Sequence, residues 1–428
     1  MRSVFAATVA VILLTGGLAG CKDSDKDSII GDDGGQPRLP KLGPFLPTPD
    51  ADPFYAQPQP LPDVPPGTIL NSRSVTFAPF GVPLPNPAWQ LQYMSADMHG
   101  RPQAAVATVV QPLVPSPLGK ALLSVQFAVN SPGLKCAPSH QVTGSRENSN
   151  SQLEALHYLP DVTLWGWTVI FPDHLGPTSS VAVGRIAAPI VLNGIRAALQ
   201  FEPLGLSADT PVGLMGYSGG GLATSWAAAL QPKIAPELNI VGAAIGGLPA
   251  NLEATARAFD GDPILFPVMF GAVLSVNRVF PQLVPLGLLN DKGLAMAEKV
   301  KDGCLGDTSD GSPGPTGQLS DYTTVEDPYA TPGAREVLPQ LNLPQPGEAP
   351  VTDVYLYHET FDQVCPVAEV EKVAAAWCKA GTRVHLFKSV TGEHLAGAAT
   401  AVPSQYLYLL SRFAGQTALL PPGTASCN

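Results

Sequence analysis

From about residue 68 onward, short continuously apolar segments alternate with longer segments whose apolar residues recur every three or four positions. The first pattern is typical of buried strands and the second of helices that pack on one side. The predicted strands are residues 104–112, 121–129, 165–173, 239–247, 351–362 and 382–390. The predicted helices are residues 184–200 and 369–381. This alternation predicts an α/β fold with a mostly parallel sheet that helices cover on both faces.

The alternation stops between residues 250 and 348. Apolar helical segments such as LFPVMFGAVLSV occur there, followed by a loop rich in Gly and Pro. We therefore predict a helical cap, or lid, at residues 250–348, inserted into a core formed by residues 52–249 and 349–428. The apolar helices of this cap are expected to shape an acyl pocket, or to form a second packing layer.

The first residues are typical of an export signal. The apolar run Val4–Leu14 is shorter than the roughly 20 residues that span a bilayer. The sequence LAGC at residues 18–21 is similar to the signal of bacterial lipoproteins, so residues 1–20 are predicted to be removed and Cys21 to carry a lipid anchor. An ordinary signal peptide with an incidental cysteine is the alternative.

The segment after the signal is polar and acidic, then crowded with proline. Such a composition cannot bury a core, so residues 21–51 are predicted to be a disordered tether, with ordered structure from about Asp52. The expected location is the bacterial cell envelope, with release into the medium as an alternative.

Composition limits the classes of partner. The chain is 45% hydrophobic and only 14% charged, so it is expected to bury a large core. Its formal net charge of −11 and its lack of a basic cluster argue against nucleic-acid binding. The oligomeric state is left open.

Five cysteines follow Cys21 in an exported chain, so disulfides are expected. They are Cys136, Cys304, Cys365, Cys378 and Cys427. Two bridges and one free thiol are the simplest arrangement, and the partners remain open. Without a close CxxC pair or clustered histidines, a zinc site is disfavoured. We expect neither a metal nor a cofactor.

The sequence GYSGGG lies where an apolar strand pattern meets a helical one. A serine at such a strand-to-helix elbow has strained backbone angles, so Gly216 and Gly220 are needed beside Ser218. Ser218 is the predicted nucleophile, and the Gly219 amide is expected to stabilise an oxyanion. The alternative is a Gly-rich turn that happens to contain serine.

A serine nucleophile needs a base and an orienting acid, which follow it in the chain in this fold. Asp362 lies just past the apolar strand sequence VYLYHET, at the end of the segment 351–362, and His394 lies in the turn after RVHLF. Their side chains are therefore expected to meet at the sheet edge where Ser218 lies. The alternatives for these two residues are a helix cap and a solvated turn.

Other acids and histidines fit less well. Asp353 begins its predicted strand, at the wrong end of the sheet, and Glu359 precedes the loop. His385 and His358 lie within or near the end of strands and are more simply packed residues. The remaining histidines precede the serine; they are His99, His140, His157 and His174.

The second oxyanion donor is expected in a loop after an earlier central strand. The sequence FPDHLGP follows the predicted strand WGWTVI, which makes Asp173 the candidate. The alternative is that Asp173 and His174 only shape a tight loop before Pro177.

Several segments resemble secretory lipases of the Candida antarctica lipase A type, including actinobacterial members. They are DPFY, PGTIL, WGWTVIFPDHLGPTSS, NGIRAAL, GYSGGGLATSWAAALQP and APELNIVGAAIGGLP. With Asp362 and His394, the resemblance covers nearly all of residues 52–415. It implies an α/β-hydrolase with an inserted lid, a Ser218, Asp362 and His394 triad, and an oxyanion hole formed by Asp173 and Gly219. The lipoprotein signal, the tether and the loop near residues 305–319 depart from the family pattern.

Together these features predict an exported, lipid-anchored carboxylic ester hydrolase, either a triacylglycerol lipase or an esterase, that forms an acyl-enzyme. The expected partners are acylglycerols or related lipid esters and, through the anchor, a membrane surface. A serine peptidase, an acyltransferase and a polyester hydrolase would share the triad. From another class, a catalytically silent envelope binding lipoprotein is a further alternative.

Overall fold

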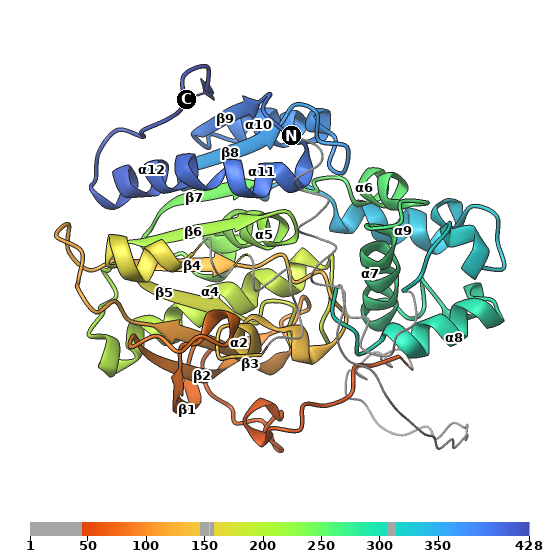
Figure 1. The fold of residues 1–428 in the computed structure, drawn as a ribbon, viewed down its shortest axis with the longest axis horizontal. Coiled ribbons are helices and arrows are strands. Elements are labelled where there is room, and N and C mark those ends of the chain that lie inside the picture. Colours follow the sequence, from red (N-terminus) through yellow and green to blue (C-terminus); the bar gives the residue numbers. More distant parts are fainter. Residues whose placement is uncertain (1–44, 146–153, 155–157, 306–313, 428) are drawn as a thin grey trace.

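The computed structural model describes residues 45–145, 154, 158–305 and 314–427 (Figure 1). The predicted signal, Cys21 and most of the predicted tether lie outside the described residues. Within the described ranges, no helix combines the length and the apolar character that a bilayer span requires.

A single sheet of ten strands runs through the described part of the chain, in the order β1-β2-β3-β5-β4-β6-β7-β8-β9-β10. The strands are β1 (Ile69–Thr76), β2 (Pro87–Ala96), β3 (Pro102–Val110), β4 (Leu122–Gln126), β5 (Thr168–Pro172), β6 (Val212–Tyr217), β7 (Ile240–Gly246), β8 (Val354–Glu359), β9 (Val384–Ser389) and β10 (Ala425–Cys427). From β5 to β9 all neighbours are parallel. β1, β2, β3 and β10 pair antiparallel at the two edges. The prediction of a mostly parallel sheet is confirmed.

Strand residues alternate between two cores, one on each face of the sheet. Leu122 and Leu214 belong to one buried cluster, whereas their chain neighbours Leu123 and Met215 belong to the other. Helices α4 (Gly184–Gln200), α5 (Gly219–Ile234) and α10 (Val367–Lys379) cover the first face. Helices α2 (Pro138–Gln141) and α12 (Val402–Phe413) cover the second. Burial on both faces explains why these strands are apolar throughout.

The predicted elements agree with the observed ones to within a few residues, and the predicted helix 184–200 coincides with α4. The largest difference in length is at β8, where the predicted strand 351–362 includes the turn that contains Asp362. Periodicity detects apolar residues, but the strand ends where its hydrogen-bonded ladder ends.

The described residues between 250 and 348, which leave out 306–313, are largely helical and lie at one end of the sheet (Figure 1, right). The helices are α6 (Leu252–Phe259), α7 (Phe266–Val279), α8 (Asp291–Val300) and α9 (Pro332–Leu341). Asn251, Asn290 and Thr331 cap the first turns of α6, α8 and α9. Phe266 and Tyr322 of this segment belong to a third buried cluster, which also includes Val364 and Cys365. We refer to residues 250–348 as the cap segment.

Short helices complete the described chain. They are η1 (Pro53–Tyr55), η2 (Pro79–Gly81), η3 (Leu134–Cys136), η4 (Asp161–Trp165), η5 (Glu202–Leu204), η6 (Leu286–Leu288), η7 (Leu319–Tyr322), η8 (Pro328–Ala330) and α11 (His394–Thr400).

Two disulfides join distant parts of the chain. Cys136–Cys304 links the loop after β4 to the cap segment, and Cys378–Cys427 links α10 to β10. Cys365 is a buried free thiol. The expected count of two bridges and one thiol is therefore observed.

The chain makes ordered contacts before Asp52, the predicted start of the core. Oδ2 of Asp50 lies 2.7 Å from Nε2 of His140 and accepts a hydrogen bond from it. The Phe45 carbonyl accepts a hydrogen bond from Arg278 of α7 at 2.8 Å. The short segment before Asp52 thus packs on both the core and the cap segment, which its proline-rich composition did not indicate.

Candidate active site

The turn between β6 and α5 forces Ser218 into a strained conformation, with φ 52° and ψ −121°. Glycine is required on both sides because of close backbone contacts. A Cβ on Gly216 would overlap the Gly220 carbonyl, and a Cβ on Gly220 would overlap the Gln126 carbonyl of β4. The Ser218 amide donates to the Gly246 carbonyl at 2.9 Å, which ties the turn to β7.

Ser218, His394 and Asp362 meet in one hydrogen-bonded line. The Ser218 hydroxyl lies 2.8 Å from Nε2 of His394, and Nδ1 of His394 lies 2.7 Å from Oδ2 of Asp362. Both His394 and Asp362 are buried. Because β6, β7, β8 and β9 are parallel neighbours, the turns that follow them reach the same edge of the sheet.

The environment of Asp362 favours a carboxylate. Burial by itself would raise its pKa, but hydrogen bonds from His394 and from the Cys365 amide outweigh that effect and hold the pKa below its usual value. Oδ1 also accepts from the Val364 amide at 2.9 Å and from the Cys365 amide at 2.7 Å. An ionised Asp362 can therefore fix Nδ1 of His394 as the protonated nitrogen.

Two residues that sequence reasoning did not place in the site hold the turn that carries His394. The Tyr217 hydroxyl donates to the His394 carbonyl at 2.7 Å. Glu359, considered as a rival acid, is buried and binds this turn instead, accepting from the Tyr357 hydroxyl at 2.6 Å and the Gly392 amide at 3.2 Å. A buried acid at the end of a predicted strand is the signal that could have indicated such a role for Glu359.

His385 packs away from this line, and His358 packs beside it, with Nε2 3.5 Å from Oδ2 of Asp362. Nε2 of His358 lies 2.7 Å from the Cys365 carbonyl, so it must carry the proton. Burial lowers the pKa of His358, which keeps the ring neutral. Nδ1 of His385 lies 2.7 Å from the Ser426 hydroxyl, at the far end of the sheet on β10.

Asp173 does not lie where the prediction required it. Its amide donates to the Val106 carbonyl at 2.9 Å, and its carboxylate accepts from the amide and hydroxyl of Ser139. Burial raises its pKa to about 6. Because β4 lies between β5 and β6, the loop after β5 is one strand too far from Ser218. The assignment of Asp173 as an oxyanion donor is therefore wrong.

Asn130, in the loop after β4, lies beside Gly219. β4 pairs directly with β6, and a Cβ on Gly219 would overlap Oδ1 of Asn130, so the two loops touch. Asn130 has a left-handed backbone, with φ 48°. Within the described ranges, its amide has no hydrogen-bond partner. Gly219 is the first residue of α5, so its amide has no acceptor within the helix.

A cavity of about 180 Å³ extends from Ser218 into the cap segment. Ser218, Gly219 and Asn130 form part of its wall. The rest is mostly apolar side chains from α4, α5, α6, α7 and α9. A narrow apolar cavity that ends at a serine suits an acyl chain better than a polar ligand.

Asp362, Cys365 and His394 place potential metal-binding atoms within 4.8 Å of one another. Hydrogen bonding already accounts for this proximity. The carboxylate of Asp362 accepts from the Cys365 amide and lies against Nδ1 of His394, whose other nitrogen contacts Ser218. These contacts account for the cluster without a metal ion.

A strand-to-helix elbow beside the central strands of a mostly parallel sheet defines the α/β-hydrolase class. The X-ray structure of Candida antarctica lipase A has this fold, with a TM-score of 0.77, 25% identity and coverage of 88% of each chain. The class of the protein is therefore that of the α/β-hydrolases.

The chain belongs to the secretory lipase family, whose sequence model matches residues 141–420. Lipase 5 of Candida albicans is 32% identical over 390 residues, which cover 87% of this chain and 83% of that protein. A Mycobacterium tuberculosis protein named as a probable inactive lipase is 33% identical over 386 residues, covering 88% and 84%. Membership supports carboxylic ester hydrolysis and export.

Proposed function

We propose that this protein hydrolyses carboxylic esters through an acyl-enzyme on Ser218. The observation that carries the proposal is the line from the Ser218 hydroxyl to His394 at 2.8 Å and from His394 to Asp362 at 2.7 Å, at the end of an apolar cavity. A serine is a weak nucleophile unless a neighbouring base takes its proton, and this geometry supplies the base and its orienting acid.

In the first half of the reaction, Nε2 of His394 takes the proton of the Ser218 hydroxyl as Oγ attacks the ester carbonyl. The carbonyl oxygen becomes an oxyanion, which accepts hydrogen bonds from the amides of Gly219 and Asn130. His394 then gives its proton to the departing alcohol, and the acyl group stays on Ser218. Asp362 stabilises the His394 cation throughout.

In the second half, a water molecule attacks the acyl-enzyme while His394 takes its proton. A second oxyanion forms against the same two amides. When it collapses, the proton passes to Ser218, and the carboxylic acid leaves. The cycle uses one ester and one water and yields one alcohol and one acid.

We further propose that the substrates are lipid esters such as acylglycerols. Residues of α6, α7 and α9 form much of the cavity wall, so the cap segment would cover the acyl chain as a lid. Covering an apolar chain removes it from water, which favours binding by about 0.8 kcal/mol for each buried methylene.

Lipid anchoring at Cys21 is part of the same proposal, and it rests on the LAGC sequence alone. Cells that express the full chain and receive a labelled fatty acid should incorporate label into the protein. The Cys21→Ser variant should not. Equal labelling of the two chains would disprove the anchor.

The central test compares the mature wild-type protein with Ser218→Ala on p-nitrophenyl esters from butyrate to palmitate. Ser225→Ala is the matched control, because Ser225 is a buried serine inside α5 that does not line the cavity. We expect hydrolysis to be lost only in Ser218→Ala. A fluorophosphonate should label wild type at Ser218, whereas a silent hydrolase fold would not label. Equal ester turnover by wild type and Ser218→Ala would reject the proposed function.

A further inference from the structure

Arg278 of α7 is a charged residue whose side chain is completely buried (0% exposed). Within the described ranges, no carboxylate pairs with it at ion-pair distance. Its guanidinium instead donates to five backbone carbonyls at 2.8 to 3.2 Å. The acceptors are the carbonyls of Phe45, Pro132, Thr178, Ser179 and Lys301.

These five carbonyls come from four separate parts of the chain. Phe45 precedes the core, Pro132 lies in the loop after β4, residues 178–179 lie in the loop after β5, and Lys301 ends α8. Only the planar fork of an arginine can donate to so many acceptors at once. Burial lowers the pKa of Arg278 to about 10, which still leaves the side chain charged at neutral pH.

Hydrogen bonds hold three backbone carbonyls of the loop after β4. The Ser131 hydroxyl donates to the Val129 carbonyl at 2.7 Å, the Ser179 hydroxyl donates to the Ser131 carbonyl at 2.8 Å, and Arg278 donates to the Pro132 carbonyl at 2.8 Å. Asn130, between these anchor points, has φ 48°. A left-handed backbone of this kind costs free energy, so neighbouring contacts must hold it.

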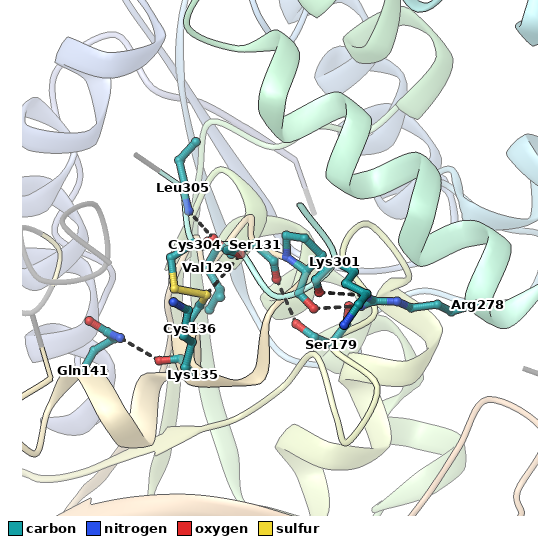
Figure 2. Close-up of a disulfide and its surroundings, with 12 residues drawn as sticks. Val129, Ser131, Lys135, Cys136, Gln141, Ser179, Arg278, Lys301, Cys304 and Leu305 are labelled. Carbon is teal, nitrogen blue, oxygen red and sulfur yellow. Dashed lines mark hydrogen bonds between the residues drawn. A yellow bond between two sulfur atoms is a disulfide. The ribbon is translucent and has the colours of Figure 1, made fainter. Parts of the chain in front are cut away.

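The contacts that α7 makes with this loop and with Ser179 come from one face of the helix. Gly271, Ser275 and Arg278 are spaced by four and three residues, so they line up along the helix. Pro132 packs directly against Gly271, and the Ser275 hydroxyl donates to the Ser179 carbonyl at 3.1 Å. The Cys136–Cys304 disulfide and the bond from the Leu305 amide to the Ser131 hydroxyl lie in the same region (Figure 2).

We propose that Arg278 is a positioning residue, which makes the conformation of the loop at residues 129–132 depend on the seating of the cap segment. When α7 is docked, Arg278 holds the Pro132 carbonyl and, through Ser179, the Ser131 carbonyl, and the Asn130 amide faces the oxyanion. When α7 moves away, the left-handed turn at Asn130 loses these contacts. This inference rests on the proposed function, in which Asn130 donates to the oxyanion.

The test must separate a misplaced oxyanion donor from a general loss of folded protein. A p-nitrophenyl ester and its thiono analogue differ only at the carbonyl atom, and sulfur is a weaker and larger acceptor than oxygen. The ratio of kcat/KM for the ester to that for the thionoester therefore reports the contribution of the oxyanion donors. A smaller fraction of folded enzyme lowers both values equally and leaves the ratio unchanged.

We expect Arg278→Met to lower kcat/KM for the ester by about 10-fold or more, with a much smaller loss for the thionoester, so that the ratio falls. Arg278→Lys keeps the charge but not the fork, and should lie between Arg278→Met and wild type. Arg196→Met is the matched control, because Arg196 joins α4 to Glu237 and the Ile234 carbonyl away from Ser218. Its ratio should equal that of wild type.

If Arg278→Met fails to fold, Ser179→Ala provides the test of the positioning role, because it removes only the hydrogen bond to the Ser131 carbonyl. Its ratio should fall in the same direction. An unchanged ratio in the variant that folds would overturn the positioning role. That result differs from failure of the proposed function, in which wild type and Ser218→Ala would turn over the ester equally.

Discussion

Replacing Ser218 by glycine should give a more stable protein than replacing it by alanine. Both variants lose the hydroxyl and its 2.8 Å contact with His394, so neither can form an acyl-enzyme. They differ in the backbone freedom of one residue. Ser218 has φ 52° and ψ −121°, a region that glycine populates freely and that a Cβ disfavours.

The size of the difference follows from two opposing terms. A non-glycine residue in such a region costs on the order of 1–3 kcal/mol, which Ser218→Ala retains and Ser218→Gly relieves. Glycine loses more chain entropy on folding, which costs roughly 0.5–1 kcal/mol. The Ser218 side chain makes no capping hydrogen bond to α5, so the loss of a helix N-cap does not add to the stability difference. The net expectation is about 1 kcal/mol in favour of glycine.

Unfolding in urea, followed by tryptophan fluorescence, measures this difference between the two variants. Ser225 provides the matched control pair, since it lies inside α5, where glycine should be less stable than alanine by about 1 kcal/mol. The sign of the glycine-minus-alanine difference should therefore reverse between the two positions. If Ser218→Gly unfolds at a lower urea concentration than Ser218→Ala, the elbow does not store strain and the reasoning fails.

Three further predictions concern Asn130, Asp173 and the cavity. Asn130→Gly should keep its activity because the amide and the left-handed turn remain, whereas Asn130→Val should lose about 10- to 100-fold in kcat/KM for p-nitrophenyl butyrate. Asp173→Asn should leave kcat/KM unchanged. Burial raises the pKa of Asp173 to about 6 in the folded protein, compared with roughly 3.9 in the unfolded chain. The free energy of unfolding of the wild type should therefore fall as pH rises from about 4 to 6. The urea midpoint of Asp173→Asn should not show this fall. Ala272→Phe, in the cavity wall on α7, should lower kcat/KM for palmitate about 10-fold more than for butyrate. An equal loss for both esters would contradict the assignment of the cavity to the acyl chain.

The strand pattern and the GYSGGG motif were sufficient to predict the α/β sheet and the elbow. Gly216 and Gly220 each have a local reason to be where they are, since a Cβ at either position would overlap a backbone carbonyl. Asp362 and His394 were predictable because they follow strands in a fixed chain order. Their meeting within 2.7 Å is a consequence of parallel pairing from β6 to β9.

The second oxyanion loop could not be predicted in the same way. A backbone amide carries no residue-type signal, so the prediction of Asp173 depended on the assumed order of the strands in the sheet. Chain order places β5 after β4, but in the sheet β4 lies between β5 and β6. That arrangement depends on long-range pairing, which apolar patterns do not report. The same holds for Arg278, whose partners are carbonyls spread from Phe45 to Lys301.

Strain in the described backbone is concentrated around the cavity. Five non-glycine residues have positive φ, and four of them, Asn130, Ser179, Ala182 and Ser218, lie in the loops after β4, β5 and β6. Each such residue costs on the order of 1–3 kcal/mol, so these loops would relax without outside support. Sheet contacts support Ser218, through the Gly246 carbonyl, whereas Arg278 of the cap segment supports Ser179 and the loop of Asn130. Within the residues that the structure describes, the cited hydrogen bond thus ties the elbow to the core, whereas the loop that faces it is held in part by the cap segment. This difference would make oxyanion stabilisation the step most sensitive to cap movement.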